Sequence, residues 1–151
     1  MLHKPTAVII LDCRFLNNDF LGEGVWWLNT LGLHVLLELR NCNKELLDQL
    51  EFVRDTLLRA ANETGATVID HIFHQFKPQG VTGVVAIAES HLCIHTWPEY
   101  GYAAADIFTC GEGFNPKEAA QIIIEAFECS DSEVTEITRG LLSSPELVQR
   151  G

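Results

Sequence analysis

The feature that most constrains the fold is a run of three strand-like segments joined by very short links. The segments cover residues 81–88, 91–97 and 102–109, and each is mostly apolar. Two residues separate the first pair and four separate the second pair. Links of this length connect antiparallel neighbours, because parallel neighbours need a crossover of a dozen or more residues. The middle of the chain is therefore predicted to form an antiparallel sheet.

Further strand-like and helical segments lie on both sides of this run. Residues 33–39 predict a strand with His34, Leu36 and Glu38 on one face. The other predicted elements are a helix capped by Asn43 that runs through Ala61, a strand over residues 67–76, a helix from Asn115 to about Phe127 and a strand over residues 133–138. Two helices among about six strands predict an α+β fold. We expect a two-layer α/β sandwich, an antiparallel sheet with helices packed on one face.

The chain has the length of one domain, which we expect to span residues 32–140. Residues 1–31 are rich in turn formers and read as an N-terminal extension of unknown role. Residues 141–151 form a C-terminal tail, in which Ser144 and Pro145 are typical of the start of a short helix.

Charge and composition exclude several classes of protein. The net charge is −11, so a nucleic-acid partner is not expected, because a phosphate backbone requires a basic face. Apolar residues make up 47%, which excludes intrinsic disorder. No apolar run has the length of a membrane span, and the N-terminus lacks the pattern of a signal peptide. Five widely spaced cysteines are a poor disulfide framework and favour the cytoplasm.

Reactive side chains gather in residues 89–99 and 102–111, and the residues alone leave three hypotheses open. In the first, these are ordinary strand residues with satisfied hydrogen bonds. In the second they bind a metal, but residues 91 and 95 of one strand lie ~13 Å apart, too far for one ion. The third makes Ser90 a nucleophile, although no G-x-S-x-G elbow surrounds it. The metal hypothesis would use His71, His74, His91 and His95 with Cys93 or Cys110.

The nucleophile hypothesis matches a known family. The segment Glu-Ser-His-Leu-x-Ile-His-Thr-Trp-Pro-Glu over residues 89–99 closely resembles the prokaryotic S-adenosylmethionine decarboxylase proenzymes. So does Gly-Tyr-Ala-Ala-x-Asp-Ile-Phe-Thr-Cys-Gly over residues 101–111. Further matches are Phe-His-x-Phe-x-Pro-Gln-Gly-Val-x-Gly over residues 73–83, Gly32-x-His34 and Arg139-Gly140. The resemblance covers about residues 32–140.

The resemblance implies a self-processing enzyme. Ser90 would attack the carbonyl of Glu89, cut the chain there and become a pyruvoyl cofactor that holds the substrate amine as a Schiff base. His95 corresponds to the family's processing histidine, and Cys110 corresponds to its proton donor. Thr82 stands where the family usually has serine, so it is expected to support processing. No metal is expected.

The resemblance also implies the substrate and the assembly. Phe76 would stack on the adenine of S-adenosylmethionine with help from Trp97, and Glu99 would hold the ribose hydroxyls. Core packing remains the alternative for the two aromatic residues. The product would supply aminopropyl groups for spermidine synthesis, and a homodimer of processed αβ protomers is expected. Two other functions remain open: a pyruvoyl-dependent arginine or ornithine decarboxylase, and an unprocessed, non-catalytic homologue.

Overall fold

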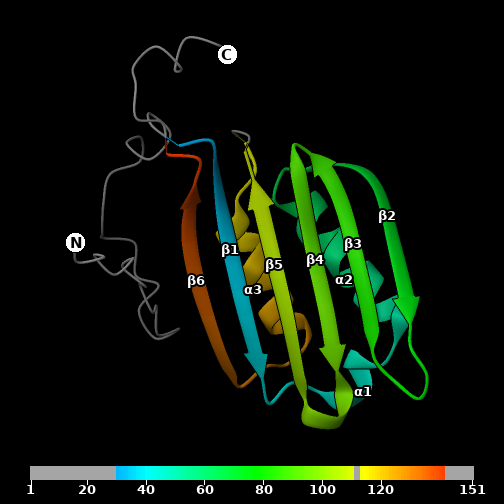
Figure 1. The fold of residues 1–151 in the computed structure, drawn as a ribbon. Helices are drawn as coiled ribbons and strands as arrows, with labels where there is room; N and C mark the ends of the chain where they lie inside the picture. Colours follow the sequence, from blue (N-terminus) through cyan, green and yellow to red (C-terminus); the bar gives the residue numbers. More distant parts are fainter. Residues whose placement is uncertain (1–29, 111–112, 142–151) are drawn as a thin grey trace, which may run out of the picture.

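The computed structural model describes residues 30–110 and 113–141, and these residues form one antiparallel sheet with helices on one face (Figure 1). The sheet has six strands in the order β2-β3-β4-β5-β1-β6 within the described residues. The predicted α+β sandwich is confirmed. In chain order the elements are β1 (Gly32–Arg40), α1 (Lys44–Leu47), α2 (Leu50–Glu63), β2 (Thr67–Gln75), β3 (Val81–Ala88), β4 (Ser90–Trp97), the 3-10 helix η3 (Pro98–Tyr100), β5 (Tyr102–Thr109), α3 (Pro116–Ala126) and β6 (Asp131–Arg139).

Alternation along the strands separates a buried face from an open face. In β1, Val35, Leu37 and Leu39 are at most 1% exposed and lie in the core, as the spacing predicts. The opposite face of the sheet carries His34 and Glu38 and is not covered by any helix of the described chain (Figure 1). The sheet therefore presents a broad polar and aromatic surface opposite its helical layer.

The single helix predicted after Asn43 is wrong, because the structure divides it into α1 and α2. Asn43 does cap α1, its side chain accepting hydrogen bonds from the next turn. The break falls at Asp48, whose carboxylate accepts from the Gly80 N–H at 2.8 Å. The Asp48 carbonyl also accepts from Gln75 Nε2 at 2.6 Å. The break therefore allows Asp48 to hold the turn between β2 and β3.

The ends of the chain lie largely outside the described residues. The predicted N-terminal extension is described only from Thr30, and the predicted tail helix at residue 144 is not described at all. None of the helices in the described ranges is long and apolar enough to cross a membrane.

Candidate active site

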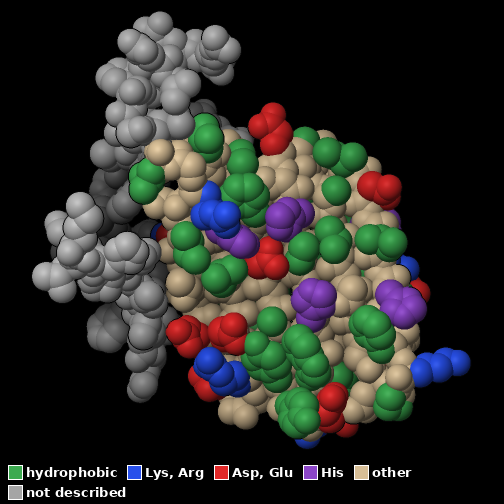
Figure 2. Space-filling view, viewed as in Figure 1, with side chains coloured by type: hydrophobic (Ala, Val, Ile, Leu, Met, Phe, Trp, Pro, Cys, Tyr) green, Lys and Arg blue, Asp and Glu red, His purple; other side chains and the backbone are tan. Residues whose placement is uncertain are grey.

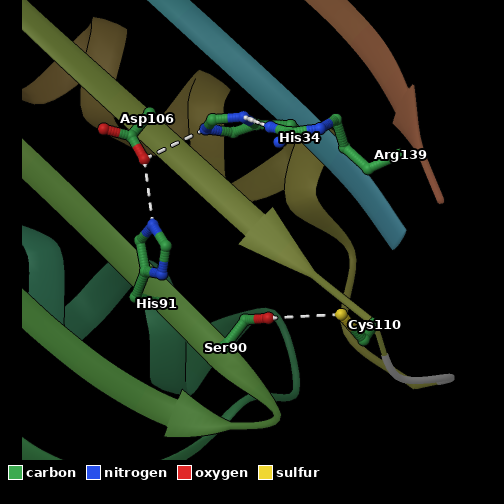
Figure 3. Close-up of polar contacts among 6 residues, drawn as sticks. All are labelled: His34, Ser90, His91, Asp106, Cys110 and Arg139. Carbon is green, nitrogen blue, oxygen red and sulfur yellow. Dashed lines mark hydrogen bonds and ion pairs between the residues drawn. The ribbon is translucent and has the colours of Figure 1, made fainter. Parts of the chain in front are cut away.

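Glu89, Ser90 and Cys110 meet at one end of the sheet. Strand β4 begins at Ser90 and the antiparallel β5 ends at Thr109, and these two residues are paired in the ladder. Cys110 therefore follows directly beside Ser90. The Ser90 Oγ lies 3.6 Å from the Cys110 Sγ (Figure 3), and the Cys110 N–H donates to the Glu89 carbonyl at 3.4 Å. A hydroxyl, the preceding carbonyl and a thiol thus share one small site.

The backbone at Ser90 adopts an unusual conformation. Its φ is 145°, although it is not a glycine. Side chains with a Cβ rarely occupy positive φ, and such a residue costs about 1–3 kcal/mol. The strain arises because β3 ends at Ala88 and β4 begins at Ser90, with Ile87 already paired to Ser90. The tight hairpin therefore strains the residue that follows the Glu89–Ser90 peptide bond.

Thr82 and His95 form a second pair at a distance from Ser90. They are cross-strand partners on β3 and β4, and the Thr82 hydroxyl is hydrogen-bonded to His95 Nδ1. His95 stands five residues beyond Ser90 on β4, which is ~17 Å along a strand. The structure therefore joins Thr82 to His95 and joins Ser90 to Cys110, but it does not bring the two pairs together within one chain.

The predicted substrate-binding residues lie near the second pair. The His95 and Trp97 rings are 6.2 Å apart, and Phe76 meets His74 edge to face at 4.8 Å. Phe76 is 50% exposed and Trp97 is 39% exposed, so the structure contradicts the core-packing alternative for both. Glu99 lies in η3, and its carboxylate accepts from Gln79 Nε2 at 3.0 Å. An exposed aromatic surface and a carboxylate thus lie at the end of the sheet opposite Ser90.

A polar cluster that the sequence analysis missed occupies the open face between these two regions. Asp106 on β5 contacts the Nε2 of His34 at 3.2 Å and the Nε2 of His91 at 3.1 Å (Figure 3). Arg139 on β6 lies 3.0 Å from the Nδ1 of His34. His91 was singled out from the sequence and its partner Asp106 lies on the neighbouring strand β5, whereas His34 and Arg139 come from strands distant in the chain. Only the sheet order, with β1 between β5 and β6, brings them together.

Hydrogen bonding accounts for this cluster better than metal binding does. Ligand atoms of His34, His91 and Asp106 lie within 4.8 Å of one another. However, a guanidinium only donates, so the Nδ1 of His34 accepts from Arg139 and its Nε2–H points at Asp106. The metal set considered from the sequence is not assembled, since no other group of three potential ligands converges in the described residues.

The Asp106 carboxylate also affects Cys93, which lies beside it on β4. Burial, and secondarily the negative charge of Asp106, raises the pKa of the Cys93 thiol to about 11. Cys93 therefore stays protonated at neutral pH in the absence of a bound ion.

Comparisons with known proteins identify relatives of this chain. The family model for S-adenosylmethionine decarboxylase matches residues 33–140. The S-adenosylmethionine decarboxylase proenzyme of Thermodesulfovibrio yellowstonii is 58% identical over 113 residues, which cover 75% of this chain and 84% of the relative. The proenzyme of the same name from Moorella thermoacetica is 49% identical over 119 residues, covering 79% and 95%.

A solved structure extends the likeness to the fold. The crystal structure of the adenosylmethionine decarboxylase from Aquifex aeolicus superposes with a TM-score of 0.72 at 36% identity, covering 77% of this chain and 96% of that one. The family match spans both the Ser90 hairpin and the exposed aromatic region. The chain therefore belongs to the S-adenosylmethionine decarboxylase family.

Proposed function

We propose that this chain cuts itself between Glu89 and Ser90, converts Ser90 into a pyruvoyl group and then decarboxylates S-adenosylmethionine. The observation that carries the proposal is the contact of Ser90 with Cys110 beside the Glu89 carbonyl. Relatives named as S-adenosylmethionine decarboxylase proenzymes support both the substrate and the self-processing. The product is the aminopropyl donor for spermidine synthesis.

The cleavage uses groups that the hairpin already holds together. The Ser90 Oγ attacks the Glu89 carbonyl carbon, and the Cys110 N–H stabilises the negative charge that forms on the carbonyl oxygen. The C–N bond then breaks, leaving an ester on Ser90 Oγ and a free amine at residue 90. Loss of the Ser90 α-proton breaks the Cβ–Oγ bond, and residues 1–89 leave with a carboxylate. The remaining enamine takes up water and releases ammonia, which leaves a pyruvoyl cap on residues 90–151.

Cys110 fits the acid required for decarboxylation. A pyruvoyl group supplies a carbonyl that takes up the electron pair left by the departing carboxylate. The substrate carbon must then receive a proton. The Cys110 thiol is exposed and lies beside residue 90, so we assign it this general-acid role.

The exposed aromatic region supplies the contacts for the nucleoside. Phe76 and Trp97 present ring faces to solvent, and stacking on a base is worth about 1–3 kcal/mol. Rings near the sulfonium add a cation–π attraction. The carboxylate of Glu99 then accepts hydrogen bonds from the ribose hydroxyls. These contacts favour a nucleoside substrate over free arginine or ornithine.

A second copy of the chain completes this site. His95 lies ~17 Å along the sheet from Ser90 in the same copy, which is too far for it to act on Ser90, and Phe76 lies at the same distant end of the sheet. The open face that carries them is rich in histidine and apolar side chains (Figure 2). Ile72 on β2, which pairs with Val84, is 72% exposed. We therefore propose a homodimer that places Ser90 and Cys110 of one copy against Thr82, His95 and the nucleoside contacts of the other.

The reducing cytoplasm suits these groups. The described cysteines are free thiols, and Cys110 must remain one to act as an acid. No nucleic acid or membrane partner enters the proposal.

The experiment that tests the substrate compares carbon dioxide release from three labelled compounds in parallel. Purified protein receives carboxyl-labelled S-adenosylmethionine, arginine or ornithine at equal concentration. We expect release from S-adenosylmethionine alone. Release from arginine or ornithine instead would replace the proposed substrate, and a chain that releases nothing and stays uncut would be a non-catalytic homologue.

A further inference from the structure

Two thiols outside the proposed active site lie in direct contact. Cys42 follows β1 and Cys129 follows α3, and 87 positions separate them in the chain. Their Sγ atoms are 2.6 Å apart, and the two groups share a hydrogen bond. Cys42 is 6% exposed, whereas Cys129 is partly exposed. The proposed mechanism uses neither residue.

Hydrogen bonds in the neighbouring backbone hold the two cysteines in this position. The Asn43 N–H donates to the Phe127 carbonyl at 2.9 Å, and the Asn43 side chain donates to Glu128 at 2.8 Å. Cys42 itself donates its N–H to the Gly101 carbonyl at 2.9 Å. The residues beside both cysteines are thus tied to each other, which keeps the two sulfurs within a small shift of bonding distance.

The hydrogen bond also shifts the pKa values of the two thiols in opposite directions. The hydrogen bond with Cys129, in which Cys129 can donate to an ionised Cys42, lowers the pKa of Cys42 below its ordinary value. The same bond raises the pKa of Cys129. Cys42 is therefore the thiol that ionises first and the better nucleophile.

We propose that Cys42 and Cys129 form a disulfide on exposure to a peroxide, and that this bond links the two halves of the processed enzyme. The second part rests on the proposed function. Cleavage between Glu89 and Ser90 places Cys42 in the fragment 1–89 and Cys129 in the fragment 90–151. The two fragments are already interleaved, because β1 of the first lies between β5 and β6 of the second.

The oxidation balances with the peroxide as the only co-reactant. The Cys42 thiolate attacks one peroxide oxygen, the O–O bond breaks, and the leaving hydroxide takes up the proton that Cys42 had released. Cys42 is then a sulfenic acid. The Cys129 sulfur attacks the Cys42 Sγ, the S–O bond breaks, and the leaving hydroxide takes the Cys129 proton as a second water. Two thiols and one peroxide thus give one disulfide and two waters.

The test uses the full processed protein and hydrogen peroxide. After exposure, free thiols are blocked with N-ethylmaleimide, and the sample is run on denaturing gels with and without reductant. We expect the two fragments to separate only with reductant. Proteolytic peptide mapping by mass spectrometry then identifies which cysteines are joined. A linked peptide pair containing Cys42 and Cys129 is the expected result.

Variants make the result specific. Cys129→Ser and Cys42→Ala should each abolish the link between fragments. Cys93→Ser should leave it intact, because Cys93 lies on the open face of β4 beside Asp106 and away from this pair. A link that survives in both Cys42 and Cys129 variants, or native protein in which both thiols are alkylated after peroxide, would overturn the proposal.

The mapping also separates this proposal from the proposed function. A chain that runs as one band even with reductant has not been cut, which counts against self-processing. The same sample still reports the Cys42–Cys129 peptide pair. Failure of cleavage and failure of the disulfide are therefore observed independently.

Discussion

At the scale of single residues, Cys110 has two separate contacts with the proposed cleavage site. Its backbone N–H donates to the Glu89 carbonyl, whereas its side chain lies 3.6 Å from the Ser90 hydroxyl. The first contact does not depend on the side chain, so processing and turnover should respond differently when the thiol is removed.

Cys110→Ala is therefore expected to cut itself but to lose most of its turnover. The backbone donor persists in the variant, while the acid that protonates the substrate carbon is gone, and general acid catalysis is typically worth 10²–10⁴-fold, by order of magnitude. A gel reports cleavage, and labelled carbon dioxide reports turnover. Cys93→Ala is the matched control, since its thiol lies on the same face but contacts neither Ser90 nor Glu89. An uncut Cys110→Ala chain would instead assign the side chain to maturation.

At the scale of the elements, the break between α1 and α2 is hydrogen-bonded to the turn between β2 and β3. The Asp48 carboxylate accepts from the Gly80 N–H, and the Phe76 N–H donates to the Gly80 carbonyl at 2.8 Å. Gly80 has a φ of 97°, so the turn itself depends on glycine at this position. Asp48 thus positions Phe76 through the turn without facing the substrate.

Asp48→Ala should lower the free energy of unfolding by about 1–2 kcal/mol, because a hydrogen bond to a charged acceptor is lost in a partly buried setting. It should also raise KM for S-adenosylmethionine more than it lowers kcat, since the nucleoside contact moves while Ser90 and Cys110 stay in place. Urea denaturation and steady-state kinetics measure the two effects. Asp55→Ala, which removes only an exposed pair with Arg54, is the control and should change neither appreciably.

Tyr102 on β5 donates a hydrogen bond to Glu38 on β1, and its ionisation is expected to destabilise the protein in alkali. Burial, and then the hydrogen bond to Glu38, raises the pKa of Tyr102 from 10.0 to about 12. The folded protein therefore holds this proton more tightly than the unfolded chain does. The resulting stability is complete below pH 10 and is lost as the pH rises through about 12.

Tyr102→Phe isolates this contribution, because the variant has no phenol to ionise. Urea denaturation at several pH values between 9 and 12 should show the wild-type chain losing more stability over this interval than the variant does. Parallel curves for the two proteins would mean that Tyr102 ionises equally in the folded and unfolded states.

The helices and strands also show which structural features could be predicted from the sequence alone. Alternation in residues 33–39 and the short links after Ala88 and Trp97 predict the strands and their faces, because both are local properties. The contact of Asp106 with His34 depends instead on β1 inserting between β5 and β6, which no local pattern encodes. The hydrogen bonds of Asp48 at the break likewise reach a turn about thirty residues away, which no local pattern predicts.

In the candidate site, too, the sequence predicts some features and the structure adds others. The motif around residue 90 identifies Glu89, Ser90 and Cys110, and hairpin pairing places them together. It also includes His95, which strand spacing already places well beyond Ser90, and the structure shows that His95 pairs there with Thr82. One motif in the sequence therefore contains residues that lie at opposite ends of the sheet in one copy of the chain.

At the scale of the whole molecule, the separation of His95 from Ser90 within one chain allows the proposed dimer to be tested by complementation. Ser90→Ala removes the proposed nucleophile, whereas His95→Ala leaves Ser90 intact and removes the proposed processing histidine. Each variant alone should stay uncut. Coexpressed, the His95→Ala chain should be cut, because the Ser90→Ala chain supplies His95 to it across the dimer.

Tags of different size on the two variants identify the cut chain on a denaturing gel. The Ser90→Ala chain must remain whole in every mixture, which provides an internal control. If the mixed chains copurify as a dimer and neither is cut, His95 acts on Ser90 of its own chain or not at all, and the shared site is wrong.

The most direct test of the account is the intact mass of the purified, active enzyme under denaturing conditions, before and after treatment with a carbonyl reagent such as a hydrazine. The account predicts two fragments, residues 1–89 and residues 90–151, with only the second gaining the mass of the reagent. Ser90→Ala should give one full-length, unreactive mass and release no carbon dioxide. A fully active preparation that consists of the uncut chain and does not react with the reagent would contradict the account.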